Sequence, residues 1–73
     1  MNSTFLSDIP WRDSLLLRVI GVTGKLGTVV AIEHESRYNI DDPDGDFTTI
    51  AWDDGTQSMQ RHYNMSLVKV IYE

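Results

Sequence analysis

The stretch that decides the fold runs from Phe47 to His62 and reads Phe-Thr-Thr-Ile-Ala-Trp-Asp-Asp-Gly-Thr-Gln-Ser-Met-Gln-Arg-His. Two runs that suit strands flank Asp-Asp-Gly, which is typical of a β-hairpin. If Asp54 and Gly55 form a two-residue turn of type I′, Ile50 pairs with Met59 and both side chains point into the core. This hairpin is the unit around which we expect the other strands to assemble.

Three more segments have the β-branched and apolar composition of strands. They span residues 14–22, 27–34 and 67–72. In the second segment, strict alternation is lost between Val29, Val30 and Ile32, which predicts a bulge.

Glycine recurs at Gly21, Gly24 and Gly27, between the first and second of these segments. This spacing predicts a turn that needs positive φ. Residues 63–66 are too few for an α-helix, so we expect one 3₁₀ turn before the last strand. Five short strands without a long helix predict an all-β small barrel.

One domain is expected, because 73 residues leave room for a single core. Residues 1–13 are predicted to form a short N-terminal arm and residues 14–73 the barrel. The arm carries Phe5, Leu6 and Trp11. Two interpretations stay open, since the arm could pack over an open end of the barrel or be an exposed docking segment.

Cysteine is absent, which excludes disulfides and a thiolate zinc site. The longest apolar runs are far below the roughly 20 residues that cross a bilayer. The N-terminus also lacks the basic and apolar regions of a secretory signal. We therefore expect a cytoplasmic protein without a membrane partner.

The formal net charge of −5 weighs against binding nucleic acid through its phosphates, since that mode needs clustered Lys and Arg. No two basic residues are adjacent in the sequence. Folding would have to assemble a nucleic-acid-binding face. Its candidate residues are Arg18, Lys25, Arg37, Arg61 and Lys69.

Residues 35–46 form a long polar loop with a run of acidic residues, and loops of this length are often functional or mobile. Carboxylates suit Ca²⁺ or Mg²⁺, but the position of Gly45 and the missing glutamate ligand depart from an EF-hand. We therefore predict a solvated acidic loop, no metal site and no cofactor. His34 and His62 are the only histidines, and no legible group of acid, base and nucleophile accompanies them, so we predict that the protein is not an enzyme.

Two stretches resemble known families. Residues 17–29, Leu-Arg-Val-Ile-Gly-Val-Thr-Gly-Lys-Leu-Gly-Thr-Val, resemble the start of a KOW motif, with its glycine-bearing turn between two strands. Residues 50–56, Ile-Ala-Trp-Asp-Asp-Gly-Thr, followed by residues 67–70, Leu-Val-Lys-Val, resemble the third to fifth strands of Tudor-like and related Src-homology-3-like barrels. The resemblance covers roughly residues 15–73 and reaches only a fold superfamily. It implies a five-stranded Src-homology-3-like small barrel with one 3₁₀ turn before the last strand.

The two resemblances imply different functions. KOW-like domains often bind RNA or the transcription and translation machinery, and Lys25 is the one match to the basic residues of their glycine turn. Tudor-like domains often bind methylated Lys or Arg in an aromatic cage through cation–π attraction. The aromatic residues on which such a cage would draw are Tyr38, Phe47, Trp52 and Tyr63.

We favour a non-catalytic protein–protein interaction module, an adaptor or an inhibitor of the kind that bacteria and phages encode. Its acidic loop would steer a basic partner and speed association. A KOW-like nucleic-acid-binding domain is the alternative. The tryptophan beside two aspartates is a second candidate contact, although a packed ring and a tight acidic turn also explain it. The predicted contact residues are Trp52, Asp53, Asp54, Tyr38, Asp41, Asp42, Asp44 and Asp46.

Overall fold

The structure, a computed structural model, describes residues 4–71. This range forms six strands and four 3₁₀ turns without an α-helix, so the predicted all-β class is confirmed. The strands are β1 (Thr4–Phe5), β2 (Arg18–Ile20), β3 (Leu26–His34), β4 (Asp46–Trp52), β5 (Gln57–Arg61) and β6 (Lys69–Val70). The turns are η1 (Leu6–Asp8), η2 (Trp11–Asp13), η3 (Pro43–Gly45) and η4 (His62–Asn64). Among these residues no helix is long and apolar enough to cross a membrane.

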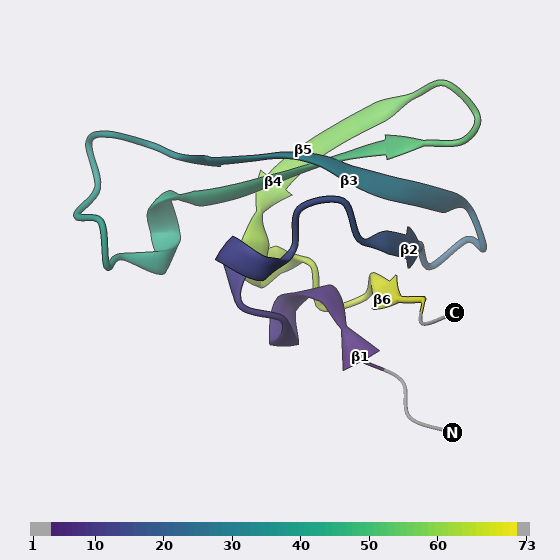
Figure 1. Cartoon of the computed structure of the whole chain (residues 1–73), viewed down its shortest axis with the longest axis horizontal. Helices are drawn as coiled ribbons and strands as arrows, with labels where there is room; N and C mark the ends of the chain where they lie inside the picture. Colours follow the sequence, from purple (N-terminus) through teal and green to yellow (C-terminus); the bar gives the residue numbers. More distant parts are fainter. Residues whose placement is uncertain (1–3, 72–73) are drawn as a thin grey trace.

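The strands form one antiparallel sheet in the order β1-β6-β2-β3-β4-β5. β2 to β5 follow one another as a meander, β6 returns to pair with β2, and β1 pairs with β6 (Figure 1). Within residues 4–71 the second edge of β5 has no strand partner, so the sheet is open. The sequence predicts five strands, and the sixth is β1, which the N-terminal arm contributes.

The hairpin of β4 and β5 differs from the predicted one by one residue. Thr49 pairs with Met59 and Ile50 pairs with Ser58, so the predicted pair of Ile50 and Met59 is wrong. Because side chains alternate between the two faces of a strand, this shift moves Met59 to the other face. Met59 is 57% exposed, whereas Ile50 is fully buried.

The turn of this hairpin explains the shift. Trp52 N donates to Thr56 O (2.8 Å) and Gly55 N donates to Trp52 O (3.0 Å), which leaves a loop of Asp53, Asp54 and Gly55. Gly55 has a φ of 94°, and neither aspartate has a positive φ. A three-residue loop with glycine last is a type I turn followed by a bulge, so the predicted type I′ turn is wrong.

The bulge predicted in β3 is confirmed, since its register with β4 shifts between Val29 and Ala31. Val30 is the extra residue. It allows Val29 and Ile32, three positions apart, both to contact the core.

The three glycines near the β2–β3 turn have different roles. Gly24 has a φ of 88° and satisfies the prediction of positive φ, whereas Gly21 and Gly27 do not share it. These two leave room for a ring, because a Cβ at Gly27 would lie 2.8 Å from Trp52 Cε3 and one at Gly21 would lie 3.0 Å from Trp52 Cη2. The side chain of Trp52 therefore packs across β2 and β3.

The strands predicted at residues 14–22 and 67–72 are both shorter in the structure, where they are β2 and β6. Residues 14–17 form a turn in which Leu17 N donates to Ser14 O (3.2 Å), and the exposed Leu16 has a φ of 68°, which is rare for a residue with a side chain. Strand pairing begins only at Arg18. The last strand is limited to Lys69–Val70, and Tyr72 lies outside the described residues.

The core is small and draws on both ends of the described chain. Its buried apolar residues are Leu6, Val19, Val29, Ile50, Met65 and Val70. Leu6 comes from the arm, and its N–H donates to Val68 O (2.7 Å). Residues 4–13 therefore pack against the sheet, as the first of the two interpretations of the arm has it.

Candidate functional site

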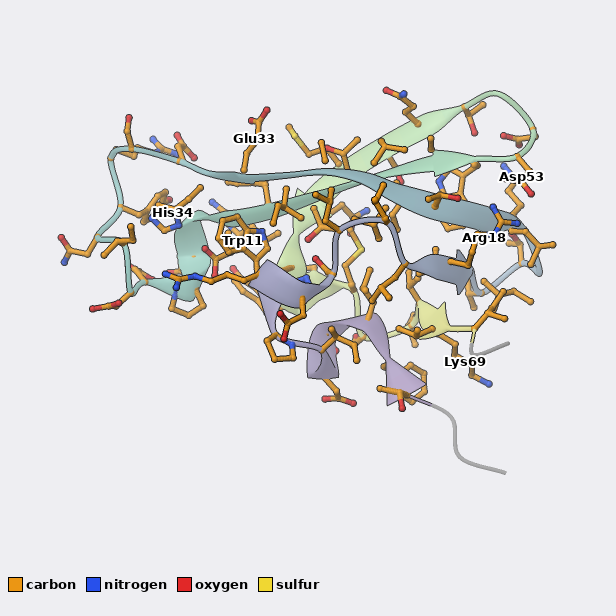
Figure 2. The ribbon with its side chains drawn as sticks, in the orientation of Figure 1. Trp11, Arg18, Glu33, His34, Asp53 and Lys69 are labelled. Atoms are coloured by element: carbon orange, nitrogen blue, oxygen red, sulfur yellow. The ribbon has the colours of Figure 1, made fainter. Side chains whose placement is uncertain are left out.

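Two polar clusters lie at opposite ends of the sheet, and the predicted contact residues divide between them. One surrounds the β4–β5 turn, where Arg18 points toward Asp53 (Figure 2). The other surrounds residues 35–46, the acidic loop, where His34 lies beside Trp11 (Figure 2).

At the first cluster, each predicted acidic contact residue is paired with a predicted basic one. The guanidinium of Arg18 binds Asp53 through two hydrogen bonds, Nη1 to Oδ1 (3.1 Å) and Nη2 to Oδ2 (3.0 Å). Lys25 Nζ lies 2.8 Å from Asp54 Oδ2. The aspartates predicted to contact a protein partner therefore neutralise the basic residues predicted to contact nucleic acid.

These contacts favour the ionised carboxylates. The hydrogen bond from Arg18 lowers the pKa of Asp53. The hydrogen bond from Lys25, followed by those from the hydroxyl and N–H groups of Thr56, holds the pKa of Asp54 well below its usual range. Both pairs therefore persist at neutral pH, although exposed ion pairs of this kind contribute little to stability.

Trp52 is a packed residue in this structure. Its Nε1 donates to Ser58 Oγ (3.0 Å), and its ring lies against Gly21 and Gly27. The half-buried side chain also contacts the core. These contacts account for a tryptophan at this position without a ligand.

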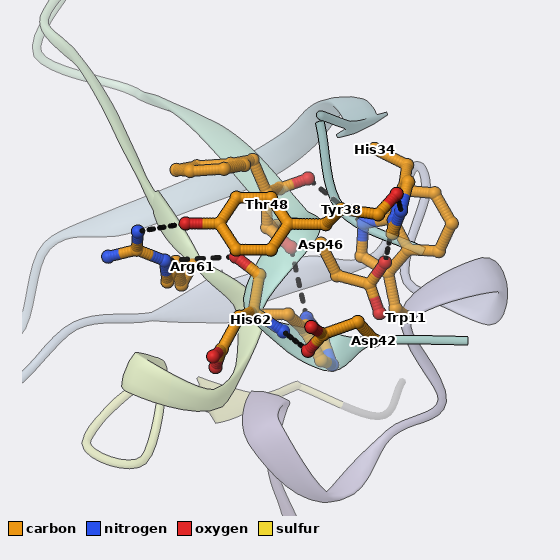
Figure 3. Close-up of polar contacts among 10 residues, drawn as sticks. Trp11, His34, Tyr38, Asp42, Asp46, Thr48, Arg61 and His62 are labelled. Atoms are coloured by element: carbon orange, nitrogen blue, oxygen red, sulfur yellow. Dashed lines mark hydrogen bonds and ion pairs between the residues drawn. The ribbon is translucent and has the colours of Figure 1, made fainter. Parts of the chain in front are cut away.

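In the acidic loop, the four aspartates have different environments, and Figure 3 shows those of Asp42 and Asp46. Asp42 Oδ1 accepts a hydrogen bond from Asp44 N (3.0 Å) at the start of η3. Asp46 Oδ1 lies 2.7 Å from His34 Nδ1. The exposed carboxylates of Asp41 and Asp44 accept no hydrogen bond from residues 4–71, but the charge of Asp44 interacts with that of Arg61. Two aspartates therefore stabilise the loop, and Asp41 presents free charge beside the partly compensated Asp44.

His34 anchors the acidic loop through both ring nitrogens. Nδ1 faces Asp46 Oδ1 at 2.7 Å, and Nε2 lies 3.3 Å from Tyr38 O. Since both partners are acceptors, the doubly protonated ring suits the site, and the hydrogen bond with Asp46 is the main cause that raises the pKa of His34 above 6.5. The ring of Trp11 packs edge-on against it, with a centroid distance of 6.1 Å.

Arg61 binds the acidic loop to β5. Its Nε donates to Asp44 O (2.9 Å) and its Nη2 donates to the Tyr38 hydroxyl (3.4 Å) (Figure 3). The guanidinium also lies 5.4 Å from the ring centroid of Phe47. Two of the aromatic residues considered for a cage, Tyr38 and Phe47, thus already contact one cation of the protein itself.

The five basic candidates are spread over both ends of the sheet. Arg18 and Lys25 belong to the turn cluster. Arg37 lies in the acidic loop, with its Nε 2.7 Å from Glu35 Oε1, and Arg61 contacts the same loop from β5. Lys69 lies on β6, 5.9 Å from the ring centroid of Phe5. A continuous basic face is not formed by these side chains.

The second histidine is part of the packing. His62 Nε2 donates to Ile9 O (2.6 Å), and its Nδ1 lies 2.9 Å from Thr48 Oγ1, so both nitrogens are used internally. In the described part of the chain, no group of three His, Asp or Glu side chains gathers in a way that could hold a metal ion.

A groove between the arm and the acidic loop is not predicted from the sequence. Its volume is about 310 Å³, and it is lined by residues 7–11, Pro43, Asp46, His62 and Tyr63. We call it the arm groove. Its three lining segments are far apart in the sequence, so no local pattern indicates that they meet.

Comparison with known proteins gave no match to a family model, to a curated protein or to a solved structure.

Proposed function

We propose that this protein is a cytoplasmic, non-catalytic interaction module, an adaptor or an inhibitor, that contacts a basic surface of a partner protein. The distribution of unpaired charge carries this proposal. Asp8 in the arm and Asp41 in the acidic loop form no ion pair with residues 4–71, and Asp44 forms no direct ion pair, although its charge interacts with that of Arg61. These carboxylates are exposed, so they give this end of the molecule a negative field that attracts cations.

The alternative, RNA binding of the KOW type, has less support from the same contacts. It would use Arg18 and Lys25, and both are paired with aspartates of the β4–β5 turn. A phosphate would have to displace a carboxylate from each of them before it could bind. Lys69 is the one predicted basic contact with neither a hydrogen bond nor an ion pair among the described residues.

We also propose that the sheet is a Src-homology-3-like barrel that stays open between β5 and β6. The return of β6 to β2 after η4 supports this, because it brings the last strand of the chain beside β2, the first strand of the meander. The arm strand β1 would then be an addition at the edge of β6.

The test uses octalysine as the basic probe and a twelve-nucleotide oligouridylate as the nucleic-acid probe. In the double variant Asp41→Lys/Asp44→Lys, we expect the association rate constant with octalysine at low ionic strength to fall at least about threefold, because steering is lost. Asp42 and Asp46 are left unchanged, since one caps η3 and the other binds His34. Stopped-flow fluorescence measures the rate.

The control is Asp13→Lys/Glu33→Lys, which changes the net charge equally at exposed sites outside the loop. Its association should slow less than that of the loop variant. Equal slowing in both variants would show that the loop does not steer. Binding of oligouridylate without binding of octalysine would overturn the proposal in favour of the RNA-binding alternative.

A further inference from the structure

We infer that the arm groove is the docking site for a basic segment of the partner, a lysine-bearing stretch with an apolar neighbour. The inference rests on the proposed function, and it names the surface and the chemistry of the ligand. It depends on the walls of the groove, on the charges that line it and on the contacts that hold it open.

The walls of the groove supply apolar and aromatic contact. Pro10 and Trp11 come from the arm, Pro43 from η3 and Tyr63 from η4. Tyr63 is 46% exposed, so its ring is accessible to a ligand. Lysine packs its aliphatic stem along such surfaces, and its ammonium group is attracted to an aromatic face.

The charges along the groove complement a cation. Asp8 and Asp46 line it, and neither Lys nor Arg does. Asp46 shares its charge with His34, whereas Asp8 has no ion pair among the described residues. Two further aspartates flank Pro43 in the sequence. A basic segment therefore meets the unpaired charge of Asp8 beside an apolar floor.

The groove is also held in shape before any ligand arrives. Trp11 Nε1 donates to Phe47 O (2.9 Å), which fixes the indole. His62 Nε2 donates to Ile9 O (2.6 Å), which joins the arm to η4. Walls held by such bonds lose little conformational entropy when a ligand binds.

Two other surface grooves fit a basic ligand less well. One is lined by Glu33, Glu35, Phe47 and Met59, but Glu35 already binds Arg37 and Phe47 already contacts Arg61. The other, between β1, β6 and the β2–β3 turn, has Lys69 in its lining. A cation in that lining repels a basic segment.

The experiment is an NMR titration of the ¹⁵N-labelled chain with the peptide acetyl-Gly-Lys-Leu-Lys-Gly-amide. The two indole N–H signals serve as reporters, because Trp11 lines the groove, whereas Trp52 is the last residue of β4 and pairs with Gly27. We expect the Trp11 signal to shift and the Trp52 signal to stay in place. The same peptide with both lysines acetylated keeps the stems but loses the charge, and it should cause no shift.

A matched pair of variants locates the charge. Asp8→Asn should weaken binding about two- to fivefold, as expected for an exposed ion pair. Asp13→Asn removes the same charge from the same arm outside the groove, and its dissociation constant should match that of the unchanged chain. Tyr63→Ala removes an exposed wall and should weaken binding by a similar factor to Asp8→Asn.

The remaining outcomes separate a failure of the docking inference from a failure of the proposed function. If the peptide binds and shifts the amide signals of Asp41 and Asp44 but leaves the Trp11 indole signal in place, the groove is not its site, while the proposed function stands. If Asp8→Asn and Asp13→Asn behave alike, the groove is again excluded. If neither the peptide nor octalysine binds at low ionic strength, the proposed function itself fails.

Discussion

Single side chains determine how the acidic loop is held against the sheet. His34 reaches Asp46 and Tyr38 at once, and Gly45 leaves room for it, because a Cβ there would lie 2.7 Å from His34 Cε1. Glu35 N donates to Gly45 O (2.8 Å), so both ends of the loop meet beside this ring. Protonation of one imidazole therefore stabilises the closed loop.

The sign of the pH dependence follows from the raised pKa of His34. Its contribution to stability is fully present below pH 6.5, the ordinary value, and is lost as pH rises through the higher folded pKa. We expect Asp46→Asn to return the pKa of His34 toward its ordinary value, since the main hydrogen bond is removed. Titration of the His34 Hε1 resonance by NMR measures this directly. Identical titration curves for the variant and the unchanged chain would contradict the prediction.

For single residues, the sequence reveals which side chains are charged but not which of them form ion pairs. The sequence predicts a tight acidic turn at Asp53 and Asp54, and a tight turn lies there, although its length and type differ from the predicted ones. Their cations, Arg18 and Lys25, come from the β2–β3 region, and Arg18 is 35 positions from Asp53. Such distant pairing depends on strand order, which a local pattern does not contain.

Among the elements, the β4–β5 hairpin shows how one turn residue controls a whole strand. Asp-Asp-Gly suits both a two-residue turn and a three-residue turn with glycine last. The two choices differ by one residue in register and place Met59 on opposite faces. The two-residue turn of Asp54 and Gly55 is the wrong choice, because the loop also includes Asp53. The bulge in β3 and the approximate positions of the strands, in contrast, follow from their local patterns.

The observed register predicts unequal effects of two truncations. Ile50→Ala should lower the free energy of unfolding by about 2–5 kcal/mol, because it leaves a cavity in the core. Met59→Ala should change it by less than about 0.5 kcal/mol, as for most exposed positions. Urea denaturation followed by circular dichroism measures both. Comparable losses would indicate that Met59 is buried, as in the predicted register.

In the molecule as a whole, the arm is part of the folded unit. Leu6 belongs to a core of six buried apolar residues, and β1 extends the sheet beyond β6. Ile9 and Trp11 add hydrogen bonds to η4 and β4. In so small a core, each buried side chain carries a large share of the stability.

We therefore expect Leu6→Ala to lower the free energy of unfolding by about 2–5 kcal/mol, a large part of the total for a small domain. The matched control is Leu67→Ala, which truncates a leucine that is 65% exposed. The melting temperature should fall for the first variant and stay nearly constant for the second. An unchanged melting temperature for Leu6→Ala would show that the arm is not part of the core.

The sequence predicts the all-β class and the approximate position of most strands, because these depend on local composition. It does not predict the arm groove. That surface needs residues 7–11, Pro43 and Tyr63 to come together, and only the complete topology brings them there. The candidate site is therefore a property of the tertiary structure, whereas the strands are largely a property of the sequence.

The bulge at Val30 divides β3 into two halves whose side chains alternate in opposite phase along the sequence. Before it, the core-facing positions are odd-numbered, as at Val29, and after it they are even-numbered, as at Ile32 and His34. Deleting Val30 would leave Val29 and Ile32 two positions apart, so regular alternation would keep both on the core face and only the bulge would be lost. The bulge is therefore the place in β3 where one residue can be removed without turning core-facing side chains toward solvent.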